Sequence, residues 1–198
     1  MKKLKPLMTP LKITAVIITI GLGLVACETK AKNPDSTMQV NFNKQASIYE
    51  GDDSILVGKH QRKQLEIAPY NQWFDANYKE YQTDSEVVSE LEPLLDGVTV
   101  KVFMGTWCSD SQHNVPAFFK IMDQAGYEYT DFELYSMTED KITPENFEEG
   151  LDIKQVPTFI IYKDGKEVNR IVEYPITSIE KDLLDILKNK GYKNPYAL

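Results

Sequence analysis

The sequence is poor in the residue types that most often build disulfide frameworks and metal centres. It contains two cysteines, Cys27 and Cys108, and two histidines, His60 and His113. Two cysteines exclude a framework of several disulfides, and four scattered Cys and His residues form no metal-binding motif. No Gly-rich loop of the kind that holds phosphates is present either. We therefore predict no metal site and no nucleotide, flavin or other cofactor.

Positive charge is scarce once the N-terminus is set aside. The formal net charge is -8, and the only charged residues among the first 26 are four lysines. Without them, 18 basic and 30 acidic residues leave a net charge of -12. Nucleic-acid binding needs clustered positive charge, so nucleic acid is not expected as a partner. We interpret the acidity as a contribution to solubility.

The N-terminus has the pattern of a secretory leader. Residues 1–12 carry the four lysines, and residues 13–26 are an apolar run of fourteen residues. A membrane-spanning helix needs about 20 residues, so this run fits the apolar region of a signal peptide at 1–26. The run ends in Leu24-Val25-Ala26-Cys27, which resembles the lipobox of bacterial lipoproteins. A signal anchor with a chance cysteine is the alternative.

The lipobox resemblance implies cleavage before Cys27 and lipid attached to that residue. Several acyl chains give stable anchoring, so the resemblance implies a lipid-anchored protein of the bacterial cell envelope, outside the cytoplasm. Residues 27–45 are polar with little periodicity, and we interpret them as the lipidated flexible tether.

Residues 46–97 are predicted to form an N-terminal helical extension. An aromatic stripe at helical spacing runs through residues 69–82 and consists of Tyr70, Trp73, Phe74, Tyr78 and Tyr81. Such a stripe favours a helix packed on a core, with a partner-binding surface as the alternative. The sequence Thr83-Asp84-Ser85-Glu86 is typical of a capping box and predicts a second helix after it.

Residues 98–190 follow a mixed α/β pattern. A β-branched run at 98–104 predicts a buried strand, and a helix follows with apolar residues at 115, 118, 119 and 122 and a stop at Gly126. We then predict a strand at 127–137, a short helix from Thr143-Pro144 to Gly150, and strands at 159–162 and 167–174 around an Asp164-Gly165 hairpin turn. Ser178 is expected to cap a final helix. This order predicts a mixed sheet covered by helices on both faces.

The order resembles the thioredoxin fold from about residue 98 to 187. A buried strand leads into Trp107-Cys108, and Pro116 lies eight residues later, where thioredoxins have a helix-kinking proline. Val156-Pro157 resembles the family's cis-proline loop. The resemblance implies an α/β thioredoxin-like domain at 98–190, with Cys108 as nucleophile and Trp107, Val156 and Pro157 as substrate-binding residues.

Three departures from the thioredoxin pattern restrict the chemistry. Where thioredoxins have Cys-x-x-Cys, this chain has Cys108-Ser109-Asp110-Ser111, so Ser111 stands at the resolving position. The buried acid of thioredoxins is replaced by Val102, and the proline inside their motif by Asp110. A thiolate at a helix N-terminus faces unpaired N–H groups, which favours a reactive thiol over an inert one. Ser111 is expected to donate its hydroxyl to the sulfur as a second catalytic residue, whereas Asp110 opposes the thiolate.

Two functions fit this pattern. With Cys27 bound to lipid, Cys108 has no thiol partner in its own chain, which predicts monothiol exchange with protein or small-molecule thiols and disulfides. The alternative is a non-catalytic binding module that recognises a peptide or redox partner through the same groove. Buried Cys108 sulfur, or a trans Pro157, argues against the enzyme.

Overall fold

The computed structural model describes residues 47–49 and 55–197. The chain divides into two units, residues 1–38 and 39–198, and the described residues all belong to the second. The predicted signal peptide at 1–26, the predicted lipidation site Cys27 and the predicted tether at 27–45 lie outside the described residues. None of the helices in the described part of the chain is both long enough and apolar enough to cross a membrane.

Six strands of the described residues form one sheet with the order β1-β2-β4-β3-β5-β6. Their bounds are β1 Ser47–Tyr49, β2 Ile55–His60, β3 Val98–Met104, β4 Phe132–Ser136, β5 Thr158–Lys163 and β6 Lys166–Val172. β3 and β4 are parallel, and each other neighbouring pair is antiparallel. The parallel pair is connected by a helix, as a parallel connection requires. The predicted mixed sheet is thereby confirmed.

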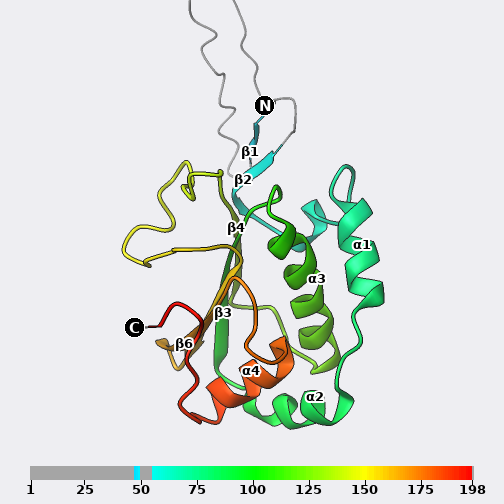
Figure 1. Ribbon diagram of the computed structural model, residues 1–198, viewed down its shortest axis with the longest axis vertical. Helices are drawn as coiled ribbons and strands as arrows, with labels where there is room; N and C mark the ends of the chain where they lie inside the picture. The colour runs from blue at the N-terminus through cyan, green and yellow to red at the C-terminus, as the bar shows by residue number, and fades with distance from the viewer. Residues whose placement is uncertain (1–46, 50–54, 198) are drawn as a thin grey trace, which may run out of the picture. The chain divides into compact units, whose positions relative to one another are not determined.

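Four α-helices of the described residues lie on one side of the sheet (Figure 1). They are α1 Asn71–Glu80, α2 Ser85–Leu91, α3 Ser109–Gln124 and α4 Ile179–Leu187, with short 3-10 turns at Arg62–Gln64 and Glu92–Leu94. Their buried residues form one hydrophobic cluster with Val100, Val102, Leu134, Phe159 and Ile171 of the strands, which we call the helix-side core. Because side chains alternate along a strand, the neighbouring strand residues face the other way.

The aromatic side chains of the helix-side core pack in contact with one another. Phe118 stacks on Phe159 with 4.7 Å between ring centroids, and Phe74 lies 5.9 Å from Phe119. Tyr70 and Phe74 are buried, and the other aromatics of the α1 stripe are half-buried against the same core. The interpretation of this stripe as core is confirmed, and residues 55–97 share their core with residues 98–187.

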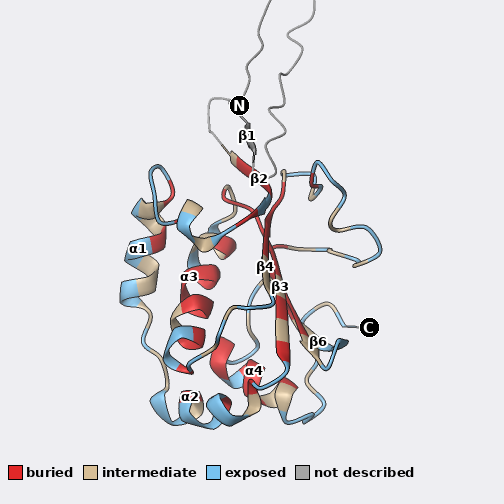
Figure 2. Cartoon of the chain, turned by 180° about the vertical axis from the view of Figure 1, so that it is seen from behind, coloured by how far each residue is buried: buried red, intermediate tan, exposed pale blue. Residues whose placement is uncertain are grey.

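The opposite face of the sheet carries a smaller hydrophobic cluster. Its buried members are Phe103, Tyr135, Met137, Val156 and Ile160, and we call it the loop-side cluster. The half-buried residues packed against it are Trp107, Cys108, Phe147, Leu151, Ile153 and Tyr162. Figure 2 shows buried strands between the helices on one side and the segment of residues 137–157 on the other. The described helices therefore cover one face, and not both as the pattern predicts.

The segment of residues 143–150 forms turns, so the prediction of a short helix there is wrong. Asn146 and Gly150 have positive φ angles of 56° and 75°, which a right-handed helix does not contain. Thr143 Oγ1 accepts from the Phe147 amide at 2.8 Å and donates to the Glu148 carboxylate. These side-chain hydrogen bonds close a local turn in competition with helix formation.

Other predicted elements are confirmed, with shifted ends. Ser178 caps α4 by accepting from the Lys181 amide at 3.4 Å, and the Asp164-Gly165 turn has φ angles of 52° and 75°. α2 is capped by Asp84, whose carboxylate accepts from the Val87 amide, and not by a box starting at residue 83. The strand expected at 127–137 spans only β4.

Two strands, β1 and β2, escaped prediction. β2 lies in the segment predicted as a helical extension, and it pairs antiparallel with β4. Its burial does not alternate, because Leu56, Val57 and Gly58 are buried in succession. Gly58 also has a φ of 89°, which interrupts a regular strand pattern.

Candidate functional site

Cys108 lies at the junction of β3 and α3. It is the N-cap residue of α3, with extended backbone angles of -90° and 123°, and its amide donates to the Gly105 carbonyl at 3.1 Å. Three residues separate it from the end of β3, so the central strand of the sheet fixes its position. Cys108 is a free, half-buried cysteine.

The thiol contacts the loop that precedes β5. Sγ donates to the Val156 carbonyl at 3.3 Å, across 48 residues of sequence. The Val156–Pro157 peptide bond is cis, and both residues are buried. The structure thus brings together Cys108, Val156 and Pro157, which the sequence analysis assigned to one site.

Trp107 covers the loop that leads to the thiol. Its indole Nε1 donates to the Met137 carbonyl at 2.9 Å, which ties this loop to the end of β4. The ring lies directly over Gly105, where an added Cβ would sit 2.5 Å from a ring carbon. Glycine is therefore required at position 105 for the indole to keep this position.

Ser111 has a different partner from the one predicted. It is fully buried, and its Oγ accepts a hydrogen bond from the Gly105 amide at 3.1 Å. The hydrogen bonds of the described residues include none between Ser111 and the sulfur of Cys108. In the first turn of α3 the serine points under the active loop, so it supports the loop that carries the thiol.

The two other positions that depart from the thioredoxin pattern, Val102 and Asp110, differ in environment from each other and from nearby His113. Val102 is fully buried in the helix-side core, so this position provides no carboxylate beneath the thiol. Asp110 is half-buried in the first turn of α3, two residues from Cys108. His113 is exposed, and its Nδ1 lies 3.3 Å from Asn77 Oδ1.

Several residues that hold the site were missed by sequence reasoning. Thr106 Oγ1 accepts from the Leu56 amide at 3.1 Å, and Gln112 Nε2 donates to the Thr106 carbonyl at 2.8 Å. Asn114 Nδ2 donates to the Glu173 carbonyl at 3.0 Å. Apart from the Gln112 contact, these hydrogen bonds join residues that are 50 or more positions apart in the sequence, so no local sequence pattern predicts them.

Within the described residues, no group of three or more His, Cys, Asp or Glu side chains is placed to hold a metal ion. Buried His60 of β2 makes its hydrogen bonds to Ser136 and Gln61. Its Nε2 is 2.8 Å from Ser136 Oγ, and its Nδ1 is 3.2 Å from the Gln61 carbonyl. Since a carbonyl only accepts, we assign the proton to Nδ1 and the acceptor role to Nε2.

A cysteine that follows a central β-strand and caps the next helix, against a buried cis-proline loop, defines a thioredoxin-fold protein. Comparison with known proteins agrees with that class. The family model described as Thioredoxin matches residues 61–185, so the chain belongs to the thioredoxin family.

Particular relatives were found by sequence and by structure. The chain is 31% identical over 77 residues to thioredoxin-2 of Saccharomyces cerevisiae, covering 39% of this chain and 68% of that protein. Among solved structures it is similar to PA1234, a protein of unknown function from Pseudomonas aeruginosa, at 14% identity and a TM-score of 0.49 over 63% of this chain and 87% of that one. It is also similar to Fasciola hepatica thioredoxin, at 20% identity and a TM-score of 0.34 over 50% and 86%.

Proposed function

We propose that this chain exchanges thiols and disulfides through Cys108 as its only reactive thiol, while a lipid at Cys27 tethers it in the bacterial cell envelope. The observation that carries the proposal is the Cys108 thiol itself. Cys108 is half-buried and occupies the N-cap position of α3, and its thiol contacts the Val156 carbonyl beside Pro157. Membership of the thioredoxin family supports the same chemistry.

The exchange consists of two balanced steps. Cys108 loses its proton to solvent, and the thiolate attacks one sulfur of a disulfide RS–SR, so that a Cys108–SR mixed disulfide forms and RS⁻ leaves. A thiolate from solution or from a second protein then attacks the mixed disulfide and restores Cys108. The second thiol must come from outside, because Ser111 stands where thioredoxins have their second cysteine.

The residues around the thiol have separate tasks in this proposal. Loss of the thiol proton also breaks the Sγ contact with the Val156 carbonyl, which frees that carbonyl for an incoming peptide amide. Trp107 and Pro157 flank the reacting sulfur. Ser111 acts as a positioning residue, because it holds the Gly105 amide at the start of the active loop.

The monothiol mechanism is tested by giving the chain a second thiol. The full-length Cys27→Ser chain and its Ser111→Cys variant are each reacted with bis(2-hydroxyethyl) disulfide, and mass spectrometry follows the peptide containing Cys108. The parent is expected to stop at the mixed disulfide until an external thiol is added. The variant is expected to release both halves of the reagent and form an internal disulfide. Spontaneous resolution in the parent contradicts the proposal, and Cys108→Ser is the control that forms no adduct.

The envelope tether needs its own experiment, since Cys27 lies outside the described residues. Cells expressing the full-length chain are labelled with a radioactive fatty acid and separated into membrane and soluble fractions. Label and membrane association are expected in the parent, and both are expected to be lost in Cys27→Ser. An unlabelled parent, or a labelled Cys27→Ser variant, contradicts lipid attachment at this residue.

The alternative of a non-catalytic binding module that uses the same groove stays a prediction, but it gains no support from the aromatic stripe at residues 69–82. Exposed aromatics there would have suited a partner-binding surface, and Tyr70 and Phe74 are buried. The remaining aromatics of this stripe are half-buried against the helix-side core. They stabilise the fold by packing on this core.

A further inference from the structure

The C-terminal segment of residues 188–197 returns along the edge of the sheet toward the thiol site. Asn169 Nδ2 of β6 donates to the Tyr192 carbonyl at 2.9 Å, and the Tyr192 hydroxyl donates to Asp182 at 2.9 Å. Beyond these two contacts, the Tyr196 hydroxyl donates to the Glu173 carboxylate. Side chains of α4 and β6 thereby hold this segment beside Glu173, the residue that follows β6.

Glu173 belongs to the structure that holds the thiol. Its amide donates to the Pro157 carbonyl at 2.7 Å, and its carbonyl accepts from Asn114 of α3 at 3.0 Å. Pro157 follows directly on Val156, whose carbonyl accepts from Cys108 Sγ. Two backbone contacts therefore fix Glu173 beside both the cis-proline loop and α3, while Tyr196 fixes its carboxylate.

Asp110 brings a second carboxylate to the same place. It stands in the first turn of α3, two residues after Cys108 and four before Asn114. Residues at i and i+4 share one face of a helix, and Asn114 donates to the Glu173 carbonyl at 3.0 Å, so Asp110 and Glu173 lie on the same side of the site. The hydrogen bond to Glu173 also raises the pKa of Tyr196 to about 12, and the charge of Asp110 acts on that phenol in the same direction.

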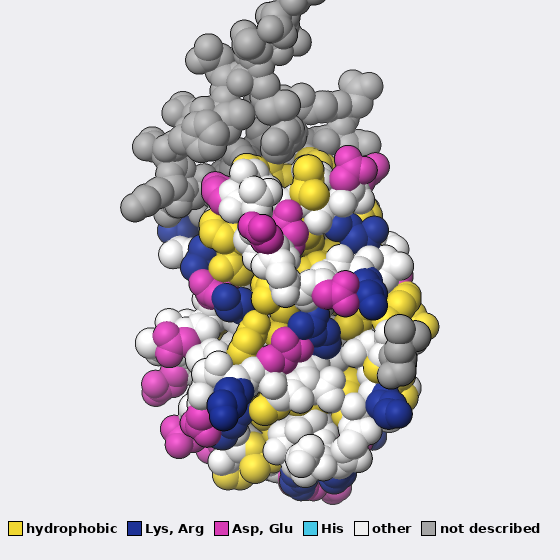
Figure 3. Space-filling model, turned by 90° about the vertical axis from the view of Figure 1, so that its left-hand side faces the viewer, with side chains coloured by type: hydrophobic (Ala, Val, Ile, Leu, Met, Phe, Trp, Pro, Cys, Tyr) yellow, Lys and Arg dark blue, Asp and Glu magenta, His cyan; other side chains and the backbone are white. Residues whose placement is uncertain are grey.

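The basic residues near Tyr196 are already paired. A cleft of about 280 Å³ is lined by Tyr196 together with Lys154 and Arg170. Lys154 lies 3.3 Å from Asp152, and Arg170 is held by both carboxylate oxygens of Glu167. The partner of Glu173 is a neutral phenol, so the charge of this carboxylate is not cancelled. Figure 3 shows the side of the molecule that carries segment 137–157, where acidic and basic side chains are interspersed with hydrophobic ones.

We propose that Glu173 and Tyr196, together with Asp110, are specificity-determining residues that favour disulfides carrying positive charge next to the sulfur. Tyr196 is the positioning residue, and the two carboxylates provide the negative charge. This inference rests on the proposed exchange at Cys108 and names its substrate class. Attraction of a cation raises the rate of mixed-disulfide formation, whereas an anionic disulfide is repelled.

The test compares three small disulfides of different charge. Cystamine is a dication, bis(2-hydroxyethyl) disulfide is neutral, and 3,3'-dithiodipropionate is a dianion at pH 7. Rates of adduct formation at Cys108 are measured on the full-length Cys27→Ser chain at low ionic strength. The readout is the ratio of the cystamine rate to the dithiodipropionate rate, compared between parent and variants so that the intrinsic reactivities of the reagents cancel.

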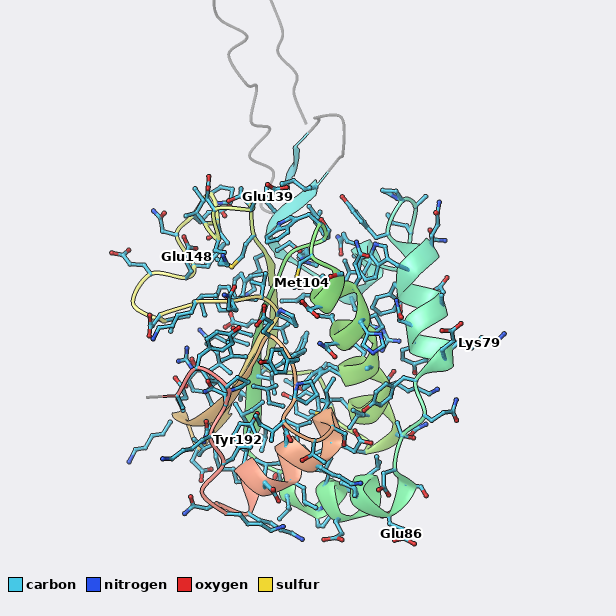
Figure 4. The ribbon with its side chains drawn as sticks, in the orientation of Figure 1. Lys79, Glu86, Met104, Glu139, Glu148 and Tyr192 are labelled. Carbon is cyan, nitrogen blue, oxygen red and sulfur yellow. The ribbon has the colours of Figure 1, made fainter. Side chains whose placement is uncertain are left out.

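Glu173→Gln and Asp110→Asn are each expected to lower this ratio about fivefold at low salt. Tyr196→Phe is expected to lower it about twofold, because the carboxylate remains but is no longer held. The differences are expected to shrink in about 1 M salt, where the screening length falls to about 3 Å. Glu86→Gln is the matched control: Figure 4 shows Glu86 at the end of the molecule opposite Met104, the last residue of the strand leading to the site.

The outcomes distinguish a failure of this inference from a failure of the proposed exchange function. If the neutral disulfide reacts but the ratio is the same in parent, Glu173→Gln and Asp110→Asn, the inference is overturned while the exchange function stands. If no disulfide reacts at Cys108, both fail. If Tyr196→Phe slows all three reagents equally, Tyr196 has a structural role alone and its assignment is overturned.

Discussion

The two faces of the sheet are built by different means. The helix-side core joins four helices to the strands through fully buried aromatic and aliphatic side chains. The loop-side cluster has five buried members and is completed by half-buried residues, Trp107 and Cys108 among them. Its cover, residues 137–157, is held by turns and by hydrogen bonds such as Trp107 Nε1 to Met137. The comparison indicates that stability is concentrated on one face and chemistry on the other.

The largest expected effect belongs to the helix-side core. Phe118→Ala removes a ring that is fully buried and stacked on Phe159, and we expect it to lower the free energy of unfolding by about 3–5 kcal/mol. Phe147→Ala is the matched change on the loop side, where the half-buried ring lies 4.8 Å from Tyr135. Urea denaturation of both variants checks the comparison. Equal losses would show that the two faces contribute alike.

The next effect concerns pH and a buried residue of β2. Burial lowers the pKa of His60 to about 4, although its hydrogen bond to Gln61 acts in the opposite direction. The unfolded chain therefore binds a proton that the folded chain excludes, between about pH 6.5 and 4. Stability is fully present above pH 6.5 and is expected to fall by about 3 kcal/mol toward pH 4.

Urea denaturation at a series of pH values measures this loss. His113→Gln, which changes an exposed histidine, is expected to leave the pH profile unaltered. His60→Gln is expected to flatten it in the same window. A parent whose stability is constant from pH 7 to 4 would contradict the neutral, buried state of His60.

A smaller effect on stability, but a large one on the site, is expected for Gly105→Ala. The new methyl group lies within 3 Å of the Trp107 ring, so the indole must move and lose its bond to Met137. Overpacking of this kind costs about 1–3 kcal/mol. We expect Cys108 alkylation by iodoacetamide to change rate in the folded variant. An unchanged rate, with unchanged tryptophan fluorescence, would show that the indole does not shape the site.

The smallest effect is expected on the solvent-facing part of the loop side. Burial alone raises the pKa of Glu133, but hydrogen bonds from Lys59 and Lys101 outweigh it and lower the pKa to about 2. Their stabilisation is present above about pH 4.5 and is lost as the pH falls toward 2. The three side chains are partly exposed, so Glu133→Gln is expected to cost less than about 1 kcal/mol at pH 7. A loss comparable to that of Phe118→Ala would remove the distinction between the faces.

Much of the helix face was predictable because its signals are local. Helical spacing of apolar residues identified α3, and a serine at the cap identified the start of α4. The β-branched run of β3 and the Asp164-Gly165 turn identified the central strand and the last hairpin. These patterns depend on neighbouring residues only, so they can be read without the fold.

The loop face was less predictable because its contacts are long-range or compete with local signals. Thr143-Pro144 resembles a helix start, but Thr143 bonds to Phe147 and Glu148 and closes a turn. At the site, the positions of Cys108 and Pro157 followed from a family resemblance. The partner of Ser111 and the contact between Tyr196 and Glu173 did not, since side-chain direction depends on the packed structure.

The most direct test of the account is the reactivity of Cys108 toward a neutral disulfide. The rate of mixed-disulfide formation with bis(2-hydroxyethyl) disulfide is measured at pH 7 for the full-length Cys27→Ser chain. An unstructured peptide with the sequence of residues 105–111 provides the reference. The account predicts a faster reaction in the folded chain, because the cis-proline loop and Trp107 hold the incoming disulfide against the half-buried Cys108. A rate equal to or below that of the peptide would contradict it and make Cys108 a structural residue.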